Sequence, residues 1–356
     1  MHDTTHRFVL FVEGDALYDA MLADLGSAQD TIRLESYIFF DDEVGKRFVD
    51  VLGRAAKSGV ATTLRLDAAG SLGGLRNASL LQLAREGVVL AWSRVWNWRH
   101  PWLFHLRNHR KLLIVDGSAV YLGGFNIHRD SSRRVVGEAR WRDTHVRITG
   151  PLVLDAIAVF DHYLHLGRTW QPSTTRGAYL LPNRTARCRH RLRCAFNDRF
   201  ASATHRIWLT TPYFVPDRHS QRRLCAAARR GIDVRLLVPG KNDVVIAQWA
   251  SRASYSHLLA AGVRIFEYQP RVLHAKTALV DRDWGTVGTA NFDYRSFFVN
   301  DELNLIVEDE SFNAELATQF EEDVASSREI TTEAWKHRHW RAPIAEAIGW
   351  GARRWL

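Results

Sequence analysis

Two copies of one short pattern, His-x-Lys-x-x-x-x-Asp, could do chemistry in this sequence. The copies place these residue types at His109, Lys111 and Asp116 and at His274, Lys276 and Asp281. In an extended strand, residues i and i+2 face the same side, so the histidine and lysine of each copy project together. An imidazole can act as a nucleophile or a general acid, and an ammonium group can neutralise phosphate oxygens. The pattern therefore indicates chemistry at phosphorus.

An asparagine lies 17 residues after each histidine, at the end of a glycine-containing turn. Glycine lets the backbone approach a ligand closely, and asparagine and threonine offer neutral donors. We therefore expect the turn residues to bind substrate, namely Gly124, Asn126, Thr289 and Asn291. Two histidines, two lysines and two asparagines related by a pseudo-twofold would suit one phosphate diester. One imidazole would attack phosphorus, and the other would protonate the departing alkoxide.

The segments around the two motifs repeat as well. Residues 21–42 align without a gap with residues 196–217, at an offset of 175, whereas the two motifs are 165 residues apart. The difference indicates an excess of ten residues in the first copy, within residues 93–108. Chance duplication of the motifs, the distal asparagines and the flanking segments together is remote, so the chain contains an internal repeat.

The elements that position the motifs follow from this repeat. Apolar strands at 61–67 and 233–239 follow helical patterns at 44–57 and 219–230, each of which ends just before a glycine. Alternating strands and helices predict the α/β class. We expect two pseudo-twofold-related repeats, each a mixed sheet flanked by helices, with the active site at their interface.

Length and composition bound the organisation of the chain. The 356 residues are 46% hydrophobic and 24% charged, which excludes wholesale disorder and a membrane bundle. No apolar run reaches the roughly 18 charge-free residues that a membrane-spanning helix needs. The apolar run near the N-terminus is also too short for the hydrophobic region of a secretory signal. Three cysteines fit a reducing compartment, so we expect a cytoplasmic location. The predicted domains are a first repeat at 1–170, a second at 171–328 and a basic, tryptophan-rich tail at 329–356.

The charge and the tryptophans point to a polyanionic partner. The net charge of +9 suits either nucleic acid or an anionic bilayer. Eight of the 13 tryptophans fall within 92–102 and 335–355. Tryptophan beside arginine is typical of a membrane interface, although the same residues suit single-stranded nucleic acid or simple packing on the domain. The tryptophans expected at an anionic membrane are Trp96, Trp98, Trp102, Trp340 and Trp355.

The sequence resembles the phospholipase D superfamily, with two HKD motifs on one chain. Within it, the sequence is most similar to bacterial cardiolipin synthases without N-terminal membrane spans. The stretches that carry the resemblance are LESYIFFDD (34–42), NHRKLLIVDG (108–117), WRDTHVRITGP (141–151), TTPYFVPD (210–217), LHAKTALVD (273–281) and GTANFDYRSFFVNDELN (288–304). The resemblance implies a peripheral inner-membrane enzyme. It would transfer a phosphatidyl group from phosphatidylglycerol to a second phosphatidylglycerol through a phosphohistidine.

The resemblance also implies roles for individual residues. His109 is the expected nucleophile and His274 the expected general acid. In this family a downstream carboxylate in each half orients an imidazole by accepting a hydrogen bond from Nδ1. Glu302 matches that position in the second half, and Asp143 is its counterpart in the first.

Other expectations concern the motif aspartates and the absence of cofactors. Asp116 and Asp281 are expected to brace a loop rather than touch the phosphate. Neither a cofactor nor a metal ion is expected, because two lysines stand where other phosphodiesterases place metal ions. Two alternatives stay open: a phospholipase D hydrolase, in which water resolves the intermediate, and a phosphodiesterase or nuclease acting on nucleic acid, which we regard as less favoured. The oligomeric state is left open.

Overall fold

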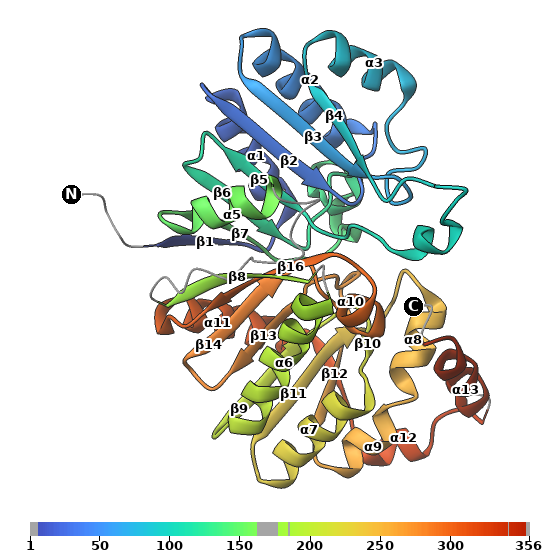
Figure 1. Ribbon diagram of the computed structural model, residues 1–356. Coiled ribbons are helices and arrows are strands. Elements are labelled where there is room, and N and C mark those ends of the chain that lie inside the picture. The colour runs from blue at the N-terminus through green and yellow to red at the C-terminus, as the bar shows by residue number, and fades with distance from the viewer. Residues whose placement is uncertain (1–5, 162–176, 184–185, 341, 354–356) are drawn as a thin grey trace. The chain divides into compact units, whose positions relative to one another are not determined.

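The computed structural model describes residues 6–161, 177–183, 186–340 and 342–353, with side chains except those of 102–103 and 186–190 (Figure 1). Contacts divide the chain into two compact units. Unit 1 consists of Met1–Thr185, Val287–Thr289 and Val299–Leu305. Unit 2 consists of Ala186–Thr286, Ala290–Phe298 and Ile306–Leu356.

The first sheet has seven strands in the order β1-β7-β6-β5-β2-β3-β4. Strands β2, β3 and β4 are parallel to one another. Strand β5 is antiparallel to β2, and the pairs β5–β6, β6–β7 and β7–β1 are also antiparallel. The sheet is therefore mixed. Its strands are β1 (Arg7–Phe11), β2 (Thr31–Ser36), β3 (Ala61–Asp67), β4 (Val89–Ser93), β5 (Leu112–Val115), β6 (Ala119–Gly123) and β7 (His145–Thr149).

The second sheet has eight strands in the order β17-β12-β11-β9-β13-β14-β16-β8. Strands β9, β11 and β12 are parallel, and β13 and β17 are antiparallel to their partners. Its strands are β8 (Ala178–Asn183), β9 (Arg206–Thr210), β11 (Asp233–Pro239), β12 (Arg264–Tyr268), β13 (Thr277–Val280), β14 (Trp284–Gly288), β16 (Glu302–Val307) and β17 (Ser327–Ile330). A separate parallel pair joins β10 (Phe214–Val215) to β15 (Phe292–Asp293).

The two sheets have the same topology. Counted from β8, the second sheet follows the order β8-β16-β14-β13-β9-β11-β12, which matches the first sheet strand for strand, and β17 is an addition. The predicted strands at 61–67 and 233–239 are β3 and β11. The expected α/β class with two repeats, each a mixed sheet flanked by helices, is confirmed.

Two equivalent helices, α2 (Glu43–Lys57) and α7 (Arg218–Arg229), each begin after a capping aspartate. Asp42 accepts hydrogen bonds from the first backbone amides of α2, and Asp217 does the same for α7, which satisfies amides that have no partner within the helix. The predicted helices at 44–57 and 219–230 are thereby confirmed as α2 and α7. The helices are α1 (Gly14–Gly26), α2 (Glu43–Lys57), α3 (Asn77–Arg85), α4 (Arg133–Val136), α5 (Leu152–Asp161), α6 (Ala186–Ser202), α7 (Arg218–Arg229), α8 (Val245–Arg252), α9 (Tyr255–Ala260), α10 (Tyr294–Phe298), α11 (Glu310–Ala325), α12 (Thr332–Lys336) and α13 (Ala342–Ala352).

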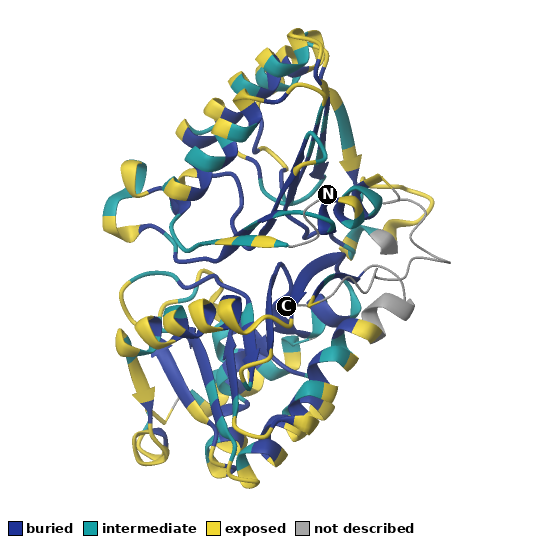
Figure 2. Ribbon diagram, turned by 90° about the vertical axis from the view of Figure 1, so that its left-hand side faces the viewer, coloured by how far each residue is buried: buried dark blue, intermediate teal, exposed yellow. Residues whose placement is uncertain are grey.

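The strands that carry the motifs lie in the core. All four residues of β5 are buried, as are three of the four in β13, and Figure 2 shows the strands mostly dark blue while the helices are yellow on their outer sides. A buried apolar side chain is stabilised by about 1.5–3 kcal/mol relative to an exposed one, so these strands anchor the residues just before them. Within the described ranges, none of the helices has the length and apolar character needed to cross a bilayer.

Candidate active site

His109 is held by backbone pairing just before β5. Its amide donates to the carbonyl oxygen of Asp301 at 2.9 Å, and the amide of Asp301 donates to Arg107 at 2.8 Å. This short stretch of pairing joins the first motif to the residue that precedes Glu302 in the chain. The side chain of His109 keeps only slight exposure. The backbone of His109 is therefore held in place, and burial restricts the conformations that its imidazole can adopt.

Glu302 meets the imidazole of His109. The Nδ1 atom of His109 lies 2.9 Å from Oε2 and 3.1 Å from Oε1 of Glu302, which is fully buried. Because an ionised carboxylate only accepts hydrogen bonds, Nδ1 must carry the proton. A neutral His109 then has its lone pair on Nε2, the form that a nucleophile needs. The carboxylate of the second half thus serves the histidine of the first motif.

Thr289 positions this carboxylate. Its hydroxyl donates to Oε2 of Glu302 at 2.6 Å and accepts from the amide of Leu303 at 2.9 Å. Its own amide donates to the carbonyl oxygen of Leu303. The hydroxyl and the amide of Thr289, a residue that the sequence predicts to bind substrate, thus both form hydrogen bonds within the protein, and the hydroxyl holds Glu302 in place.

Lys111 and Tyr37 complete the surroundings of His109. The ammonium of Lys111 donates to the carbonyl oxygen of His109 at 2.8 Å and lies 5.3 Å from the ring centroid of Tyr37. The ring of Tyr37 meets the imidazole edge to face, with 4.9 Å between centroids. The sequence alone left the role of Tyr37 open, since strand packing would explain an aromatic residue there equally well.

The second motif has a different neighbour at its imidazole. The Nζ atom of Lys276 lies 2.7 Å from Nδ1 of His274, and it also donates to the carbonyl oxygen of that residue. An ammonium group only donates, so Nδ1 of a neutral His274 accepts here and the ring proton is on Nε2. Tyr213 faces this ring at 6.5 Å, as Tyr37 faces the first. His274 can act as a general acid only as the imidazolium, in which both ring nitrogens carry a proton.

The two motif aspartates bind backbone amides away from the imidazoles. Both adopt a left-handed backbone conformation, with φ of 49° at Asp116 and 53° at Asp281. Burial opposes their ionisation, but the amide hydrogen bonds outweigh it and lower the pKa of both carboxyls. The amides belong to Gln29, Asp30 and Thr31 for the first and to Thr204, His205 and Arg206 for the second. Each aspartate thus braces the segment before β2 or β9.

Asp143 occupies the place in the first half that Glu302 occupies in the second. The amide of Gly124 donates to the carbonyl oxygen of Thr144 at 2.8 Å, which is the equivalent of the bond from Thr289 to the residue after Glu302. Asp143 is buried, and a Cβ atom at Gly124 would lie 2.0 Å from its Oδ1. Glycine is therefore needed here to make room for the carboxylate.

The two distal asparagines are buried but differ in their contacts. The Oδ1 atom of Asn126 accepts from the amide of Ile38 at 3.2 Å, and its carbonyl oxygen accepts from Tyr18. The amide of Asn291 donates to Ser296, while its side-chain Oδ1 has no hydrogen-bond partner within the described part of the chain. The side-chain oxygen of Asn126 holds the loop after β2, so only its amide group can serve a substrate.

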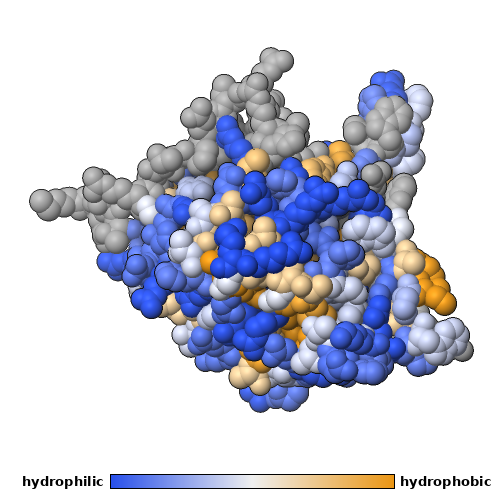
Figure 3. Space-filling view, turned by 90° about the horizontal axis from the view of Figure 1, so that it is seen from below, coloured by the Kyte–Doolittle hydropathy of each residue, from blue (hydrophilic) through white to orange (hydrophobic). Residues whose placement is uncertain are grey.

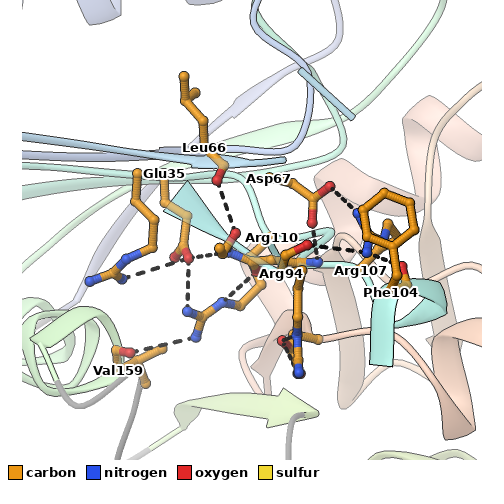
Figure 4. A network of polar contacts seen from close by, with 12 residues as sticks. Glu35, Leu66, Asp67, Arg94, Phe104, Arg107, Arg110 and Val159 are labelled. Atoms are coloured by element: carbon orange, nitrogen blue, oxygen red, sulfur yellow. Dashed lines mark hydrogen bonds and ion pairs between the residues drawn. The ribbon is translucent and has the colours of Figure 1, made fainter. Parts of the chain in front are cut away.

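A buried polar network supports the residues on both sides of His109 (Figure 4). Arg110 has no exposed surface and donates to Oε1 of Glu35 at 2.9 Å, which also accepts from Asn108 at 2.5 Å. Arg107 pairs with Asp67 at 3.2 Å. A buried charge is tolerated only where it is paired, so this network fixes the motif in one arrangement. Its members gave no signal in the sequence beyond being polar residues in or beside apolar strands.

Arg94 anchors the segment that leads to Glu302. It forms a bidentate ion pair with Asp301, with Nη2 at 2.6 Å and 2.8 Å from the two carboxylate oxygens. Bidentate pairs fix geometry as well as charge. Asp301 also accepts the backbone hydrogen bond of His109, so the ion pair steadies both His109 and the neighbouring Glu302.

His145 is a further buried histidine of the first half. Burial lowers its pKa to about 3, with Asp143 raising it and Lys111 lowering it. The ring is therefore neutral at physiological pH. It stands beside Gly123, where a Cβ atom would lie 2.5 Å from its Cα.

The tryptophans expected at a membrane are partly described. Trp96, Trp98 and Trp340 are 58%, 76% and 68% exposed. The side chain of Trp102 and the whole of Trp355 lie outside the described residues. Trp335, from the same tail, is buried and donates to Ser256 at 2.9 Å, so part of the tail packs on unit 2. In the described part of the chain, no group of three or more His, Cys, Asp or Glu residues could hold a metal ion.

Comparison with known proteins identifies relatives over nearly the whole chain. The family model described as "Cardiolipin synthase, PLD-like domain" matches residues 21–152 and 196–324. Cardiolipin synthase A of Pseudomonas putida strain GB-1 is 34% identical over 341 residues, which cover 93% of this chain and 71% of that protein. Cardiolipin synthase of Clostridium perfringens strain SM101 is 30% identical over 359 residues, which cover 95% and 75%. The fold is similar to that of phosphatidylserine synthase from Haemophilus influenzae, with a TM-score of 0.71 at 14% identity over 98% of this chain and 95% of that one.

Proposed function

Because the chain belongs to the cardiolipin synthase family of phospholipase D-like enzymes, we propose that it converts two molecules of phosphatidylglycerol into cardiolipin and glycerol through a phosphohistidine. The chain is a phospholipase D-type phosphatidyltransferase. The observation that supports His109 as the nucleophile is its hydrogen bond to Glu302, which holds the proton on Nδ1 and leaves the lone pair of Nε2 free to attack.

In the first half-reaction, Nε2 of His109 attacks the phosphorus of phosphatidylglycerol. The bond between phosphorus and the glycerol oxygen breaks. His274, present as the imidazolium, gives its Nε2 proton to that oxygen and becomes neutral, so that neutral glycerol leaves. A phosphatidyl group is then covalently attached to His109. Lys111 and Lys276 neutralise the non-bridging oxygens as charge develops on them.

In the second half-reaction, the hydroxyl of another phosphatidylglycerol replaces glycerol. It gives its proton to His274 and attacks phosphorus, and the bond to His109 breaks. Asn126, Asn291 and the backbone at Gly124 are proposed to bind the phosphodiester, while Asp143 and Glu302 position the imidazoles. An alcohol resolves the intermediate in place of water if it is better positioned and the site is dry.

We further propose that the enzyme acts on the cytoplasmic face of the inner membrane as a peripheral protein. The net charge of +9 and the exposed Trp96, Trp98 and Trp340 support this location. Indole rings favour the depth of the lipid headgroups, and basic side chains are attracted to anionic lipid. The relatives' name implies a lipid substrate, which fits the same surface.

The reaction is tested with liposomes that contain labelled phosphatidylglycerol. We expect labelled cardiolipin and one glycerol for each cardiolipin formed. Phosphatidic acid as the main product would replace the transferase with the hydrolase. Cleavage of single-stranded DNA without any lipid product would replace both with a nuclease. A chain with both Lys111→Ala and Lys276→Ala is the negative control for contaminating activity.

The same assay tests whether the chemical step needs a metal ion. Two lysines supply the positive charge that metal ions supply elsewhere, so EDTA should leave the rate unchanged. The rate should also follow a bell-shaped pH profile, because one histidine must be neutral while the other is protonated. Loss of more than about 90% of the rate in EDTA, restored by Mg²⁺, would contradict this scheme.

A further inference from the structure

Unit 2 contains a pocket of about 680 Å³ whose lining includes no residue of either motif. It lies between α7, α9 and the C-terminal helix α13. The residues that we use below are Arg218, Arg222, Arg229, Ala253, Pro343 and Trp350. We call it the arginine pocket. The match to the family model ends at residue 324, so α13 lies outside the matched residues.

Three arginines of α7 line this pocket from one side. Arg218, Arg222 and Arg229 are spaced by four and seven residues, which places them on one face of the helix. All three are exposed, and within the described ranges none of them has a carboxylate at ion-pair distance. Uncompensated positive charge around a pocket attracts an anion, and guanidinium groups bind phosphate oxygens in pairs.

Two nearby arginines of unit 2 do have carboxylate partners. Arg193 pairs with Asp217 at 2.9 Å, and Arg252 pairs with Glu267 at 2.7 Å. The one carboxylate that lines the pocket, Glu346, is buried and is already neutralised by a bidentate pair with Arg338. The pocket therefore keeps the full charge of the α7 arginines.

The opposite wall of the pocket is apolar and firmly attached. Pro343 and Trp350 of α13 face Ala253 across it. Gly349 lets α13 lie directly against α8, since a Cβ atom there would be 2.3 Å from the amide nitrogen of Ala250. The helix is thus a fixed wall. A small, fully hydrated anion would gain nothing from such a wall, whereas an anion that carries hydrocarbon would.

Apolar side chains also reach the surface beside the pocket. Ile344 and Ile348 are 57% and 53% exposed and lie one turn apart on α13. Figure 3, which views the structure from below, shows hydrophobic side chains at the surface between hydrophilic ones. Exposed apolar residues next to unpaired basic residues are typical of a surface that enters a bilayer.

We propose that the arginine pocket binds the phosphate of one anionic phospholipid, and that Ile344 and Ile348 enter the acyl region beside it. The site is a second lipid site, separate from the two histidine motifs. It would dock unit 2 on an anionic bilayer through α7 and α13. The inference does not depend on which reaction the histidines catalyse.

The test measures binding to vesicles of phosphatidylcholine with and without phosphatidylserine, an anionic lipid that is not a substrate of the proposed reaction. The variant Arg218→Gln/Arg222→Gln/Arg229→Gln removes the pocket charges. A matched control, Lys46→Gln/Arg54→Gln/Arg85→Gln, removes three exposed positive charges of unit 1. Basic residues near an anionic surface each strengthen binding, so we expect the pocket variant to bind at least about tenfold more weakly and the control to change much less.

A second variant tests the apolar part of the site. Ile344→Ser/Ile348→Ser changes two exposed side chains, so the fold should be kept, and we expect weaker binding to the anionic vesicles at unchanged charge. Thermal unfolding of all variants shows whether they remain folded. Equal losses in the two charge variants would overturn the proposal, because they would indicate general electrostatic attraction. So would loss of single-stranded oligonucleotide binding in the pocket variant with vesicle binding intact. Because phosphatidylserine binding needs no turnover, failure to make cardiolipin would leave this result unaffected.

Discussion

The two histidine motifs have the same sequence pattern but stand in different surroundings. In the first, Nδ1 of His109 meets the buried Glu302, and in the second, Nδ1 of His274 meets Lys276. The carboxylate selects the tautomer with a lone pair on Nε2, and the ammonium selects the tautomer with a proton there. The same motif thus has a carboxylate hydrogen bond to its imidazole in the first half and a lysine contact in the second, so the two rings favour different neutral tautomers.

The structural support beneath the motifs differs as well. The first has the buried charged pair of Arg110 and Glu35. At the equivalent positions the second has Ala275, which is buried, and Thr210. The strands adopt the same pairing in both halves, with β5 antiparallel to β2 and β13 antiparallel to β9. The same strand pairing is therefore supported by a buried charged pair in the first half and by smaller, uncharged residues in the second.

The largest effect is expected from replacing the histidines. His109→Ala and His274→Ala should each lower the rate with phosphatidylglycerol at least about 10³-fold, since each removes a group that makes or breaks a bond. A phosphatidyl ester of p-nitrophenol separates their roles, because this leaving group needs no acid. It should restore covalent labelling to the His274 variant and not to the His109 variant. The opposite pattern would exchange the two roles.

The next effect tests the charged network of the first half. Arg110→Ala leaves the carboxylate of Glu35 buried without its main partner and should lower the free energy of unfolding by about 3–5 kcal/mol. Replacing both members with the residues of the second half, as Arg110→Ala/Glu35→Thr, should recover a large part of that loss. Urea unfolding monitored by circular dichroism measures both. If the double variant is as unstable as the single one, the two supports are not equivalent.

The carboxylate at His109 is tested by Glu302→Gln. A glutamine can donate to Nδ1 and so select the wrong tautomer, and we expect kcat to fall about 10²-fold with KM nearly unchanged. Thr289→Ala should cost less, because it removes one of the hydrogen bonds to the carboxylate. Thr289→Ser keeps the hydroxyl and serves as the control. A KM effect without a kcat effect would mean that Glu302 binds substrate instead.

The sequence sufficed for the repeat and its elements because equivalent positions carry equivalent residues. The strands β3 and β11 and the helices α2 and α7 follow from local spacing, and the resemblance implies the bracing of loops by Asp116 and Asp281. The partner of His109 did not follow from it. An offset shows which residues are equivalent, but it does not show which of them touch, and Glu302 lies 193 residues from His109 in the chain. For the same reason, the sequence did not predict the hydrogen bond from the Thr289 hydroxyl to Glu302.

The motif aspartates provide a matched pair of smaller effects. Asp116→Asn and Asp281→Asn should each lower the free energy of unfolding by about 1.5–3 kcal/mol, since each weakens hydrogen bonds to a charged group. The second variant should lose slightly more, because Asp281 also accepts from the Thr204 hydroxyl. The folded-state pKa of both carboxyls is lowered. Their contribution is therefore complete above the ordinary aspartate pKa of about 3.9 and is lost as the pH falls through the folded-state value. Unfolding measured at pH 7 and at pH 3 should show the difference shrinking in acid.

The smallest effect concerns His145. The equivalent residue of the second half is Asn304. A Cβ atom at Gly288 would lie 2.4 Å from Cγ of that asparagine, as one at Gly123 would lie against His145. The pKa of His145 falls from 6.5 to about 3 on folding, so between these two pH values the unfolded chain binds more protons than the folded one.

Because of this difference in bound protons, the folded state loses stability as the pH falls below 6.5, by up to about 1.4 kcal/mol per pH unit. His145→Asn removes this dependence. The stability difference between parent and variant should shift by about 1 kcal/mol in favour of the variant between pH 7.5 and pH 5.5. Parallel curves over that range would show that His145 is protonated in the folded protein.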